Sequence, residues 1–494
     1  TALLIKATIH DAKGERGSAL EAMRGAQKLL AGCDDAFVQA RAERIHGNIR
    51  FSMGEFSEAR RYYEGSLLTC QRTNDRIGQA TALNGVGNVH SAQSDYTRAR
   101  GCYEKSLSIS QEVGDRSGEA TSLGNIGSVY SAVGDYVRAR EYHEKSLLIK
   151  EKIGDRRGQA ASLNNLGNVY GLQGQYGRAR EYYEKSLAIS QETSDYGGQA
   201  SSLNNLGNLH GSQGRYQAAR NYFDKALAMW QEIGHRSGQA TSLGNIGRVY
   251  LSLSDYTHAR EYFEEALAIQ QAIGDRSAQA KSLDNLGSAY RLLGDQERAR
   301  EYHEKGLAIR QEIGDRSGQA GSLVNIGSLY LLQGNYARAR EYSEMALAIQ
   351  KEIGDRNGQA GSLDNLGIVC QSSGDHARAR EYHEKSLAIE HEIGDQISEA
   401  RSLGNLGTSY ASQGDYMRAL EYYEKAMDLL TPFGMKEQMQ RNGANLIRTL
   451  SCLAAEAMCR GEFARAEEFM GKALSFAREA NADEALSAFL GKMV

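Results

Sequence analysis

Apolar residues recur along this chain with the spacing of amphipathic helices. Within residues 155–194, Leu163, Leu166 and Tyr170 share one face of a helix expected over about 157–172. A second helix is expected over about 176–193. Asp155 is placed to cap the first helix, and Gly174 to end it. Neither helix can bury its apolar stripe alone, so each pair must stack on its neighbours.

The same pattern returns every 40 residues. Glycine keeps this step at ten positions: Gly47, Gly87, Gly127, Gly167, Gly207, Gly247, Gly287, Gly327, Gly367 and Gly407. Such self-similarity indicates one array of repeats, in which each unit contacts only its neighbours, rather than the three domains that 494 residues would suggest. We expect Gly167 and Ala179 to lie where the two helices of a unit cross, because small side chains permit close approach.

The repeat divides the chain into three parts. Residues 1–36 are expected to form a truncated N-terminal repeat, residues 37–430 ten in-phase units, and residues 431–494 an atypical C-terminal repeat with a capping helix at about 482–492. Pro432 and Gly434 precede a longer helix expected at about 435–459, and Gly461 breaks the phase. The chain starts inside a helix pattern, so we expect it to be part of a longer protein.

Two short motifs carry a resemblance to the tetratricopeptide repeat. They are N-L-G-x-x-Y in the first helix (Asn165, Leu166, Gly167, Tyr170) and G-x-Y-x-x-A-x-x-x-Y at the second (Gly174, Tyr176, Ala179, Tyr183). The 40-residue unit is similar to the long-helix subclass of Pins-type scaffolds, kinesin light chains and bacterial sensor regions. The resemblance implies an all-α, right-handed superhelical α-solenoid of about twelve helix-turn-helix units, with the first helices lining a concave groove.

A row of asparagines is the candidate binding site. Asn165 lies about 200° from Leu163 on a helical wheel, away from the core and toward the groove. The candidate peptide-binding residues are Asn125, Asn165, Asn168, Asn205, Asn208, Asn245, Arg248, Lys281, Asn285, Asn325, Asn365 and Asn405. Amides repeated about 10 Å apart can pair with the N–H and C=O groups of an extended peptide.

Two interpretations of this row stay open. The repeat superhelix of the transferase that attaches GlcNAc to nuclear proteins has a similar asparagine ladder for its peptide. Alternatively, each asparagine bonds the neighbouring repeat and only fixes the stacking. The two cations, Arg248 and Lys281, are expected to pair with an acidic side chain of a partner.

The net charge and the composition restrict which classes of partner this protein can bind. The net charge of -4 argues against nucleic acid, which would need a basic excess. No apolar run is long enough for a membrane helix, and no secretory signal opens the chain. The six cysteines form no C-x-x-C pair, which favours a reducing compartment and a cytoplasmic location.

No catalytic motif is present, so we expect no enzymatic activity, metal or cofactor. His143, His303 and His383 occupy the repeat position of Tyr183 and are expected to be packing residues, as is the single tryptophan, Trp230, at the rim.

The sequence therefore predicts a non-enzymatic protein- or peptide-binding scaffold or adaptor. One alternative is the sensor arm of a larger signalling protein, whose NTPase, caspase-like protease or transcription-regulator module would lie N-terminal to these residues. Another is a spacer that self-associates along its length.

Overall fold

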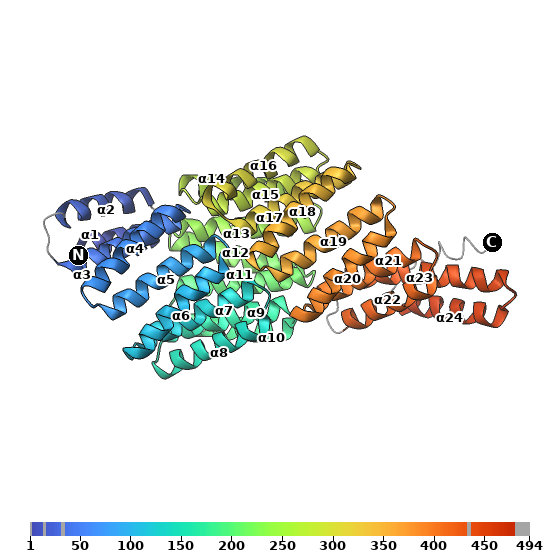
Figure 1. The fold of residues 1–494 in the computed structure, drawn as a ribbon, viewed down its shortest axis with the longest axis horizontal. Coiled ribbons are helices and arrows are strands. Elements are labelled where there is room, and N and C mark those ends of the chain that lie inside the picture. Colours follow the sequence, from blue (N-terminus) through green and yellow to red (C-terminus); the bar gives the residue numbers. More distant parts are fainter. Residues whose placement is uncertain (1, 13–15, 31–34, 432–435, 480–494) are drawn as a thin grey trace. The chain divides into compact units, whose positions relative to one another are not determined.

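The computed structural model describes residues 2–12, 16–30, 35–431 and 436–479, and its regular structure there is helical. Within these ranges, twenty-four helices follow one another as hairpin pairs (Figure 1). They are α1 (Ala2–Ala12), α2 (Arg16–Leu30), α3 (Ala36–Ser52), α4 (Phe56–Arg72), α5 (Arg76–Ala92), α6 (Tyr96–Glu112), α7 (Arg116–Ala132), α8 (Tyr136–Lys152), α9 (Arg156–Leu172), α10 (Tyr176–Glu192), α11 (Tyr196–Ser212), α12 (Tyr216–Glu232), α13 (Arg236–Ser252), α14 (Tyr256–Ala272), α15 (Arg276–Leu292), α16 (Gln296–Ile313), α17 (Arg316–Leu332), α18 (Tyr336–Ile353), α19 (Arg356–Ser372), α20 (His376–Ile393), α21 (Gln396–Ala411), α22 (Tyr416–Leu430), α23 (Lys436–Cys459) and α24 (Phe463–Glu479). The predicted all-α repeat fold is confirmed.

The helices gather into two compact units. The first unit comprises Thr1–Gly171, Tyr176–Leu329 and Ala348–Asp355. The second comprises Leu172–Gln175, Tyr330–Leu347 and Arg356–Val494. No helix in the part of the chain that the structure describes is long and apolar enough to span a membrane.

Glycine and aspartate together make the turn between repeats, as the sequence predicts. Gly154 adopts a φ of +72°, which ends α8, and Asp155 Oδ1 accepts a hydrogen bond from the backbone N of Gly158 at 2.9 Å. Helices α9 and α10 each lie within one residue of the predicted bounds at both ends. An ion pair from Arg156 to Glu192 then ties one turn to the next.

The glycine of the first helix makes room for an aromatic ring of the second helix, a contact that the sequence prediction did not specify. A Cβ added at Gly167 would lie 2.5 Å from the ring of Tyr183. The equivalent Gly207 faces Phe223 and Gly247 faces Phe263 at similar distances. The close approach is therefore between a helix backbone and a ring, which explains why the glycine recurs with the aromatic residue of the second helix.

Replacing Gly207 by Ala is expected to lower the free energy of unfolding of its repeat by about 1–3 kcal/mol through overpacking. The added Cβ would lie 2.5 Å from the Phe223 ring, which is buried and cannot retreat freely. Thermal unfolding followed by circular dichroism measures the effect. Gly244→Ala is the matched control in the next first helix, because no atom lies within 4 Å of the added Cβ. Equal melting of the two variants would contradict the ring-contact explanation.

Buried serine and glutamine side chains join the repeats by hydrogen bonds. Ser186 Oγ donates to the carbonyl of Ala160 at 2.8 Å and lies 3.0 Å from Ser202 Oγ of the following repeat. Gln159 Nε2 donates to the carbonyl of Lys150, nine residues earlier, at 3.1 Å. These polar groups are satisfied where they are buried, so the same residue types recur at these positions.

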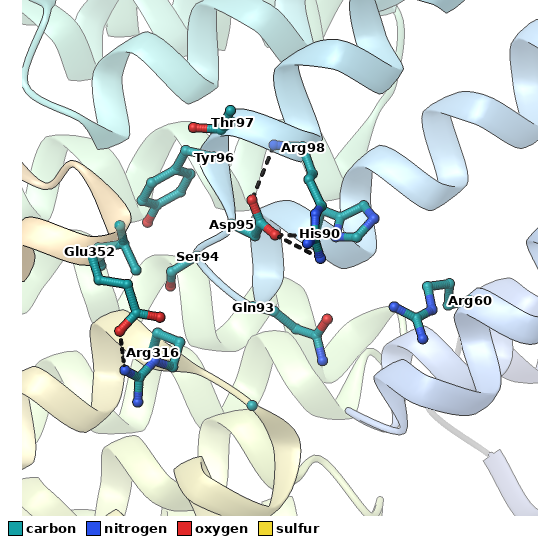
Figure 2. A pocket seen from close by; sticks show the side chains of 12 residues that line it. Arg60, His90, Gln93, Ser94, Asp95, Tyr96, Thr97, Arg98, Arg316 and Glu352 are labelled. Atoms are coloured by element: carbon teal, nitrogen blue, oxygen red, sulfur yellow. Dashed lines mark hydrogen bonds and ion pairs between the residues drawn. The ribbon is translucent and has the colours of Figure 1, made fainter. Parts of the chain in front are cut away.

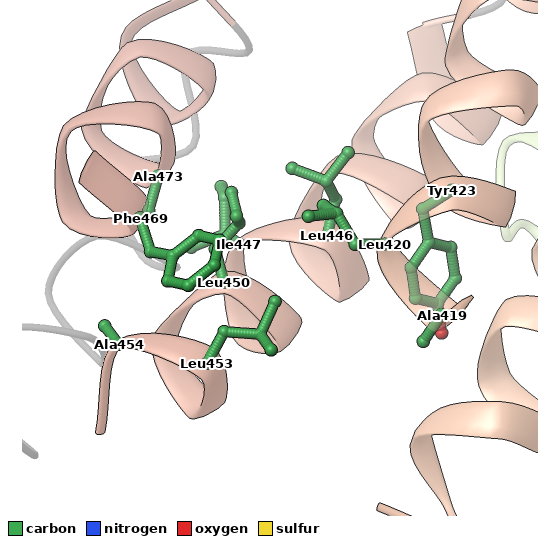
Figure 3. Close-up of a cluster of buried hydrophobic side chains, with 10 residues drawn as sticks. All are labelled: Ala419, Leu420, Tyr423, Leu446, Ile447, Leu450, Leu453, Ala454, Phe469 and Ala473. Carbon is green, nitrogen blue, oxygen red and sulfur yellow. The ribbon is translucent and has the colours of Figure 1, made fainter. Parts of the chain in front are cut away.

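In the second unit, a cluster of buried apolar side chains holds the last two described helices together. Figure 3 shows Phe469 of α24 close to Ile447 and Leu450 of α23, within a cluster that also includes Tyr423 of α22. Helix α23 coincides with the longer helix predicted at about 435–459. Pro432, Gly434 and the capping helix predicted at 482–492 fall outside the described residues.

The expectation that each repeat contacts only its neighbours is wrong within the first unit. The backbone N of Ser317, at the start of α17, donates to Ser94 Oγ at 3.0 Å, although 223 residues separate them. A small rotation from each repeat to the next accumulates until distant turns meet.

Candidate peptide-binding face

Six of the eight regularly spaced asparagines lie in the first unit, one on each first helix of successive repeats. They are Asn125 (α7), Asn165 (α9), Asn205 (α11), Asn245 (α13), Asn285 (α15) and Asn325 (α17). Asn365 (α19) and Asn405 (α21) belong to the second unit. Asn245 is buried and the other seven are half-buried. We call the surface formed by the six residues of the first unit the Asn face.

Most asparagines of this row take no part in hydrogen bonds between repeats. Only its two ends reach a neighbouring repeat, where Asn125 Nδ2 lies 3.5 Å from Asn84 Oδ1 and Asn405 Nδ2 lies 3.1 Å from Asp364 Oδ2. The side chains of the six asparagines between them, from Asn165 to Asn365, make no hydrogen bond to any residue in the described ranges. Apart from that of the buried Asn245, their amide groups are therefore open to another partner.

The residue just before the asparagine makes the stacking bonds instead. Asn164 Nδ2 donates to Ser202 Oγ at 3.1 Å, and Ser242 Oγ donates to Asn204 Oδ1 at 3.2 Å. Asn84 and Ser122 make the same pair at 3.3 Å. Stacking through side-chain amides thus exists in this protein, but at a different position from the predicted row.

A cleft of about 290 Å³ opens on the Asn face between α9 and α11. It brings together three of the predicted residues, Asn165, Asn168 and Asn205. The rest of its lining is small or polar: Arg157, Ala160, Ala161, Asn164, Asp195, Gly198 and Ser201. The small side chains leave the space that an extended backbone would need.

Asn168 and Asn208 differ in whether the side-chain amide already has a hydrogen-bond partner. The hydroxyl of Tyr183 donates to Asn168 Oδ1 at 2.8 Å, so part of this amide serves its own repeat. In the next repeat Phe223 replaces that tyrosine, and the exposed Asn208 side chain makes no hydrogen bond to any described residue. The Asn168 amide therefore has one internal partner, while the Asn208 amide has none in the described chain.

Two predicted cations on the Asn face lie close enough to influence each other. Arg248 and Lys281 are exposed to solvent, but desolvation by the protein atoms around them lowers the pKa of each. The charges of Arg248 and Arg310 lower the pKa of Lys281 further. Neither side chain forms an ion pair with any residue that the structure describes. An anion placed here would relieve an uncompensated positive charge.

Arg157 is a site residue that the sequence analysis missed. It lines the cleft beside Asn165 and has no ion pair within the described part of the chain. Ser117, Gly197 and Ser237 stand at the same position in other repeats. A search for outliers within each repeat position would have found this arginine.

The outer charges behave differently from these cations. Arg140 and Glu144, and likewise Arg180 and Glu184, lie 3.8 Å and 3.7 Å apart as exposed pairs one helical turn apart. Such surface pairs contribute little to stability, and they leave no unbalanced charge. Arg157, Arg248 and Lys281 have no such carboxylate partner among the described residues.

In the second unit, ionisable side chains surround the buried Asp364 on α19. His383 Nδ1 lies 2.6 Å from Asp364 Oδ1, and Arg401 Nε lies 3.3 Å from Asp364 Oδ2. Glu390 of α20 is fully buried beside them, and burial raises its pKa to about 7. Arg401 is therefore held by two internal carboxylates, so it differs from Arg248 and Lys281.

The residues set aside as packing residues are buried. His303 and His383 each pair with an aspartate of the first helix, and His143 is buried without one. Trp230 lies in the core rather than at the rim. Among the residues described, no group of three or more histidine, cysteine, aspartate or glutamate side chains could hold a metal ion.

Stacked helix pairs that present one repeated polar face define a helical-repeat scaffold of the protein-interaction type. The tetratricopeptide repeat family matches residues 38–112, 118–192, 198–272, 255–312, 318–390 and 359–431. The chain belongs to this family, a generally non-catalytic class that includes adaptors and sensor arms.

One solved structure shows the same kind of fold, and two others match more weakly. A Rap protein complexed with Competence and Sporulation Factor is 14% identical, with a TM-score of 0.51 over 80% of this chain and 98% of that one. A signal-transduction ATPase with a tetratricopeptide repeat sensor from Pyrococcus horikoshii is 17% identical, with a TM-score of 0.45 over 72% and 54%. A putative kinesin light chain from Podospora anserina is 22% identical, with a TM-score of 0.34 over 40% and 97%. No curated protein sequence matches the chain.

Proposed function

We propose that this protein is a scaffold or adaptor whose Asn face binds an extended polypeptide segment. The observation that carries the proposal is the line of amides from Asn165 to Asn325 that have no hydrogen-bond partner among the described residues. Each amide offers both donors and an acceptor, the groups that a peptide backbone needs at a regular spacing. A Rap protein of similar fold is known in complex with Competence and Sporulation Factor, which supports binding as the role of such a solenoid.

The charges on this face select an acidic segment. Arg157, Arg248 and Lys281 lie on α9, α13 and α15 and have no carboxylate partner in the described chain. A carboxylate of the bound segment would meet Arg248 and Lys281 together. Because protein surrounds these two cations, the pairing is stronger than at an open surface and still weakens with added salt.

The double variant Asn165→Ala, Asn205→Ala tests the proposal. Each lost hydrogen bond is expected to reduce binding by about 0.5–1.5 kcal/mol, so affinity should fall roughly five- to a hundredfold. The probe is a fluorescein-labelled 12-residue peptide, selected on the wild-type protein from a random displayed library and measured by anisotropy. We expect the selected peptides to be rich in aspartate or glutamate, and the thermal melt of the variant to match the wild type.

Asn204→Ala is the matched control, because this neighbouring amide makes a stacking bond to Ser242. It should melt earlier and bind normally in the folded fraction. If the double variant behaves like this control, the row only fixes the stacking and the proposal is wrong.

A further inference from the structure

Two turns that are far apart in the sequence meet within the first unit. Ser94, between α5 and α6, accepts its hydrogen bond from Ser317 N, and Gln93 Nε2 donates to the carbonyl of Ile313 at 3.4 Å. The partners are 223 and 220 residues apart, about five and a half repeats. One turn of the repeat array therefore closes on itself here.

An apolar residue is buried at the same contact. Ile313, at the end of α16, is 7% exposed and packs with Phe56, Ala59 and Val86. Val113 and Ile153 stand at the same repeat position and are 39% and 41% exposed. In these two repeats the side chain is open to solvent, whereas at Ile313 the distant turn buries it.

The contact continues along the edges of neighbouring repeats. A Cβ added at Gly54 would lie 3.3 Å from the Cβ of Arg276, and one at Gly274 would lie 3.7 Å from Met53 Cε. Ile353, one repeat beyond Ile313, is buried as well. Successive turns therefore meet at several points, all within the first unit.

A polar cleft of about 510 Å³ lies beside this contact. Figure 2 shows Asp95 paired with Arg98 and His90 on one side, and Glu352 paired with Arg316 on the other. Its charged groups are paired mainly within each side. The direct bonds from Gln93 and Ser94 and the burial of Ile313 therefore join the two sides.

We infer that these residues form a clasp, defined as Gln93 and Ser94 on one side and Ile313 and Ser317 on the other. The clasp holds one turn of the solenoid closed and so sets the curvature of the Asn face. Its contacts are made between turns and are partly polar, so it can open without unfolding a repeat, since the helices of each repeat keep their own packing. This inference does not depend on what the Asn face binds.

Ile313→Asp tests the clasp by placing a charge in the contact. Small-angle scattering should show a larger radius of gyration, with helical circular dichroism unchanged. Ile153→Asp introduces the same charge at the same repeat position away from the contact, and it should leave the radius of gyration at the wild-type value. Equal radii for the two variants would overturn the inference.

Cross-linking gives a second test that does not require the clasp to be disrupted. In a Cys459→Ser background, the pair Ser94→Cys, Ser317→Cys should form an intramolecular disulfide under mild oxidation, because Ser94 Oγ lies 3.0 Å from Ser317 N. The control pair Ser94→Cys, Ser237→Cys uses the equivalent serine of another repeat and should remain reduced. If the two pairs oxidise at the same rate, the turns do not meet and the clasp does not exist.

Discussion

Replacing Trp230 by Ala is expected to lower the free energy of unfolding of its repeats by about 3–5 kcal/mol. The indole is 8% exposed and packs among Ala200, Leu203 and Ala226. A Cβ added at Gly238 would lie 2.4 Å from the ring, so the ring also presses on the backbone of α13. Truncation leaves a cavity at the junction of two repeats, which rigid helices cannot close.

Hydrogen exchange measures this effect where it arises. Repeat arrays open locally, so backbone amides of α11, α12 and α13 should exchange faster while those of α3 and α4 stay protected. Tyr196→Ala is the control, because this aromatic residue of α11 is largely solvent-exposed. If the backbone amides exchange at the same rates in both variants, Trp230 is not a core residue.

Glu390→Gln is expected to stabilise the second unit at pH 8 by about 3 kcal/mol and to have little effect at pH 4.5. Burial raises the pKa of the Glu390 carboxyl to about 7, above its ordinary value of 4.5. The folded state therefore holds this proton more tightly than the unfolded state. The contribution of Glu390 to the free energy of unfolding is fully present below about pH 4.5 and is lost as the pH rises through 7.

The charged side chains next to Glu390 do not reverse this dependence of stability on pH. The pKa of Asp364 is lowered despite its burial, through its hydrogen bond and ion pair with His383, so its contribution changes only below pH 4. Arg401 lies 3.8 Å from Glu390 and is also paired with Asp364.

Denaturant unfolding at pH 4.5, 6 and 8 checks the prediction. Glu381→Gln is the control, since this exposed residue of α20 pairs only with Lys385 across one helical turn. A wild-type stability that does not fall between pH 4.5 and 8 would contradict the buried ionisation.

Local spacing was sufficient to predict the helices and their ends. The 40-residue step, the glycine with φ of +72° at 154 and the Asp155 cap all follow from rules that act within a few residues. The face of the asparagine row could be predicted for the same reason, because a helical wheel needs only the residues of one helix. Its role could not, since Asn164 and Asn165 differ by one position and only the neighbouring repeat decides which of them forms a bond.

The sequence by itself thus determined the repeat, its helices and the face that carries the asparagines. The tertiary structure alone decided which amides and which cations have no partner within the described residues, and where distant turns meet. Ile153 and Ile313 make the difference plain, because they are the same residue at the same repeat position with different burial. The rotation between repeats accumulates over hundreds of residues, and no local pattern records the place where it brings two turns together.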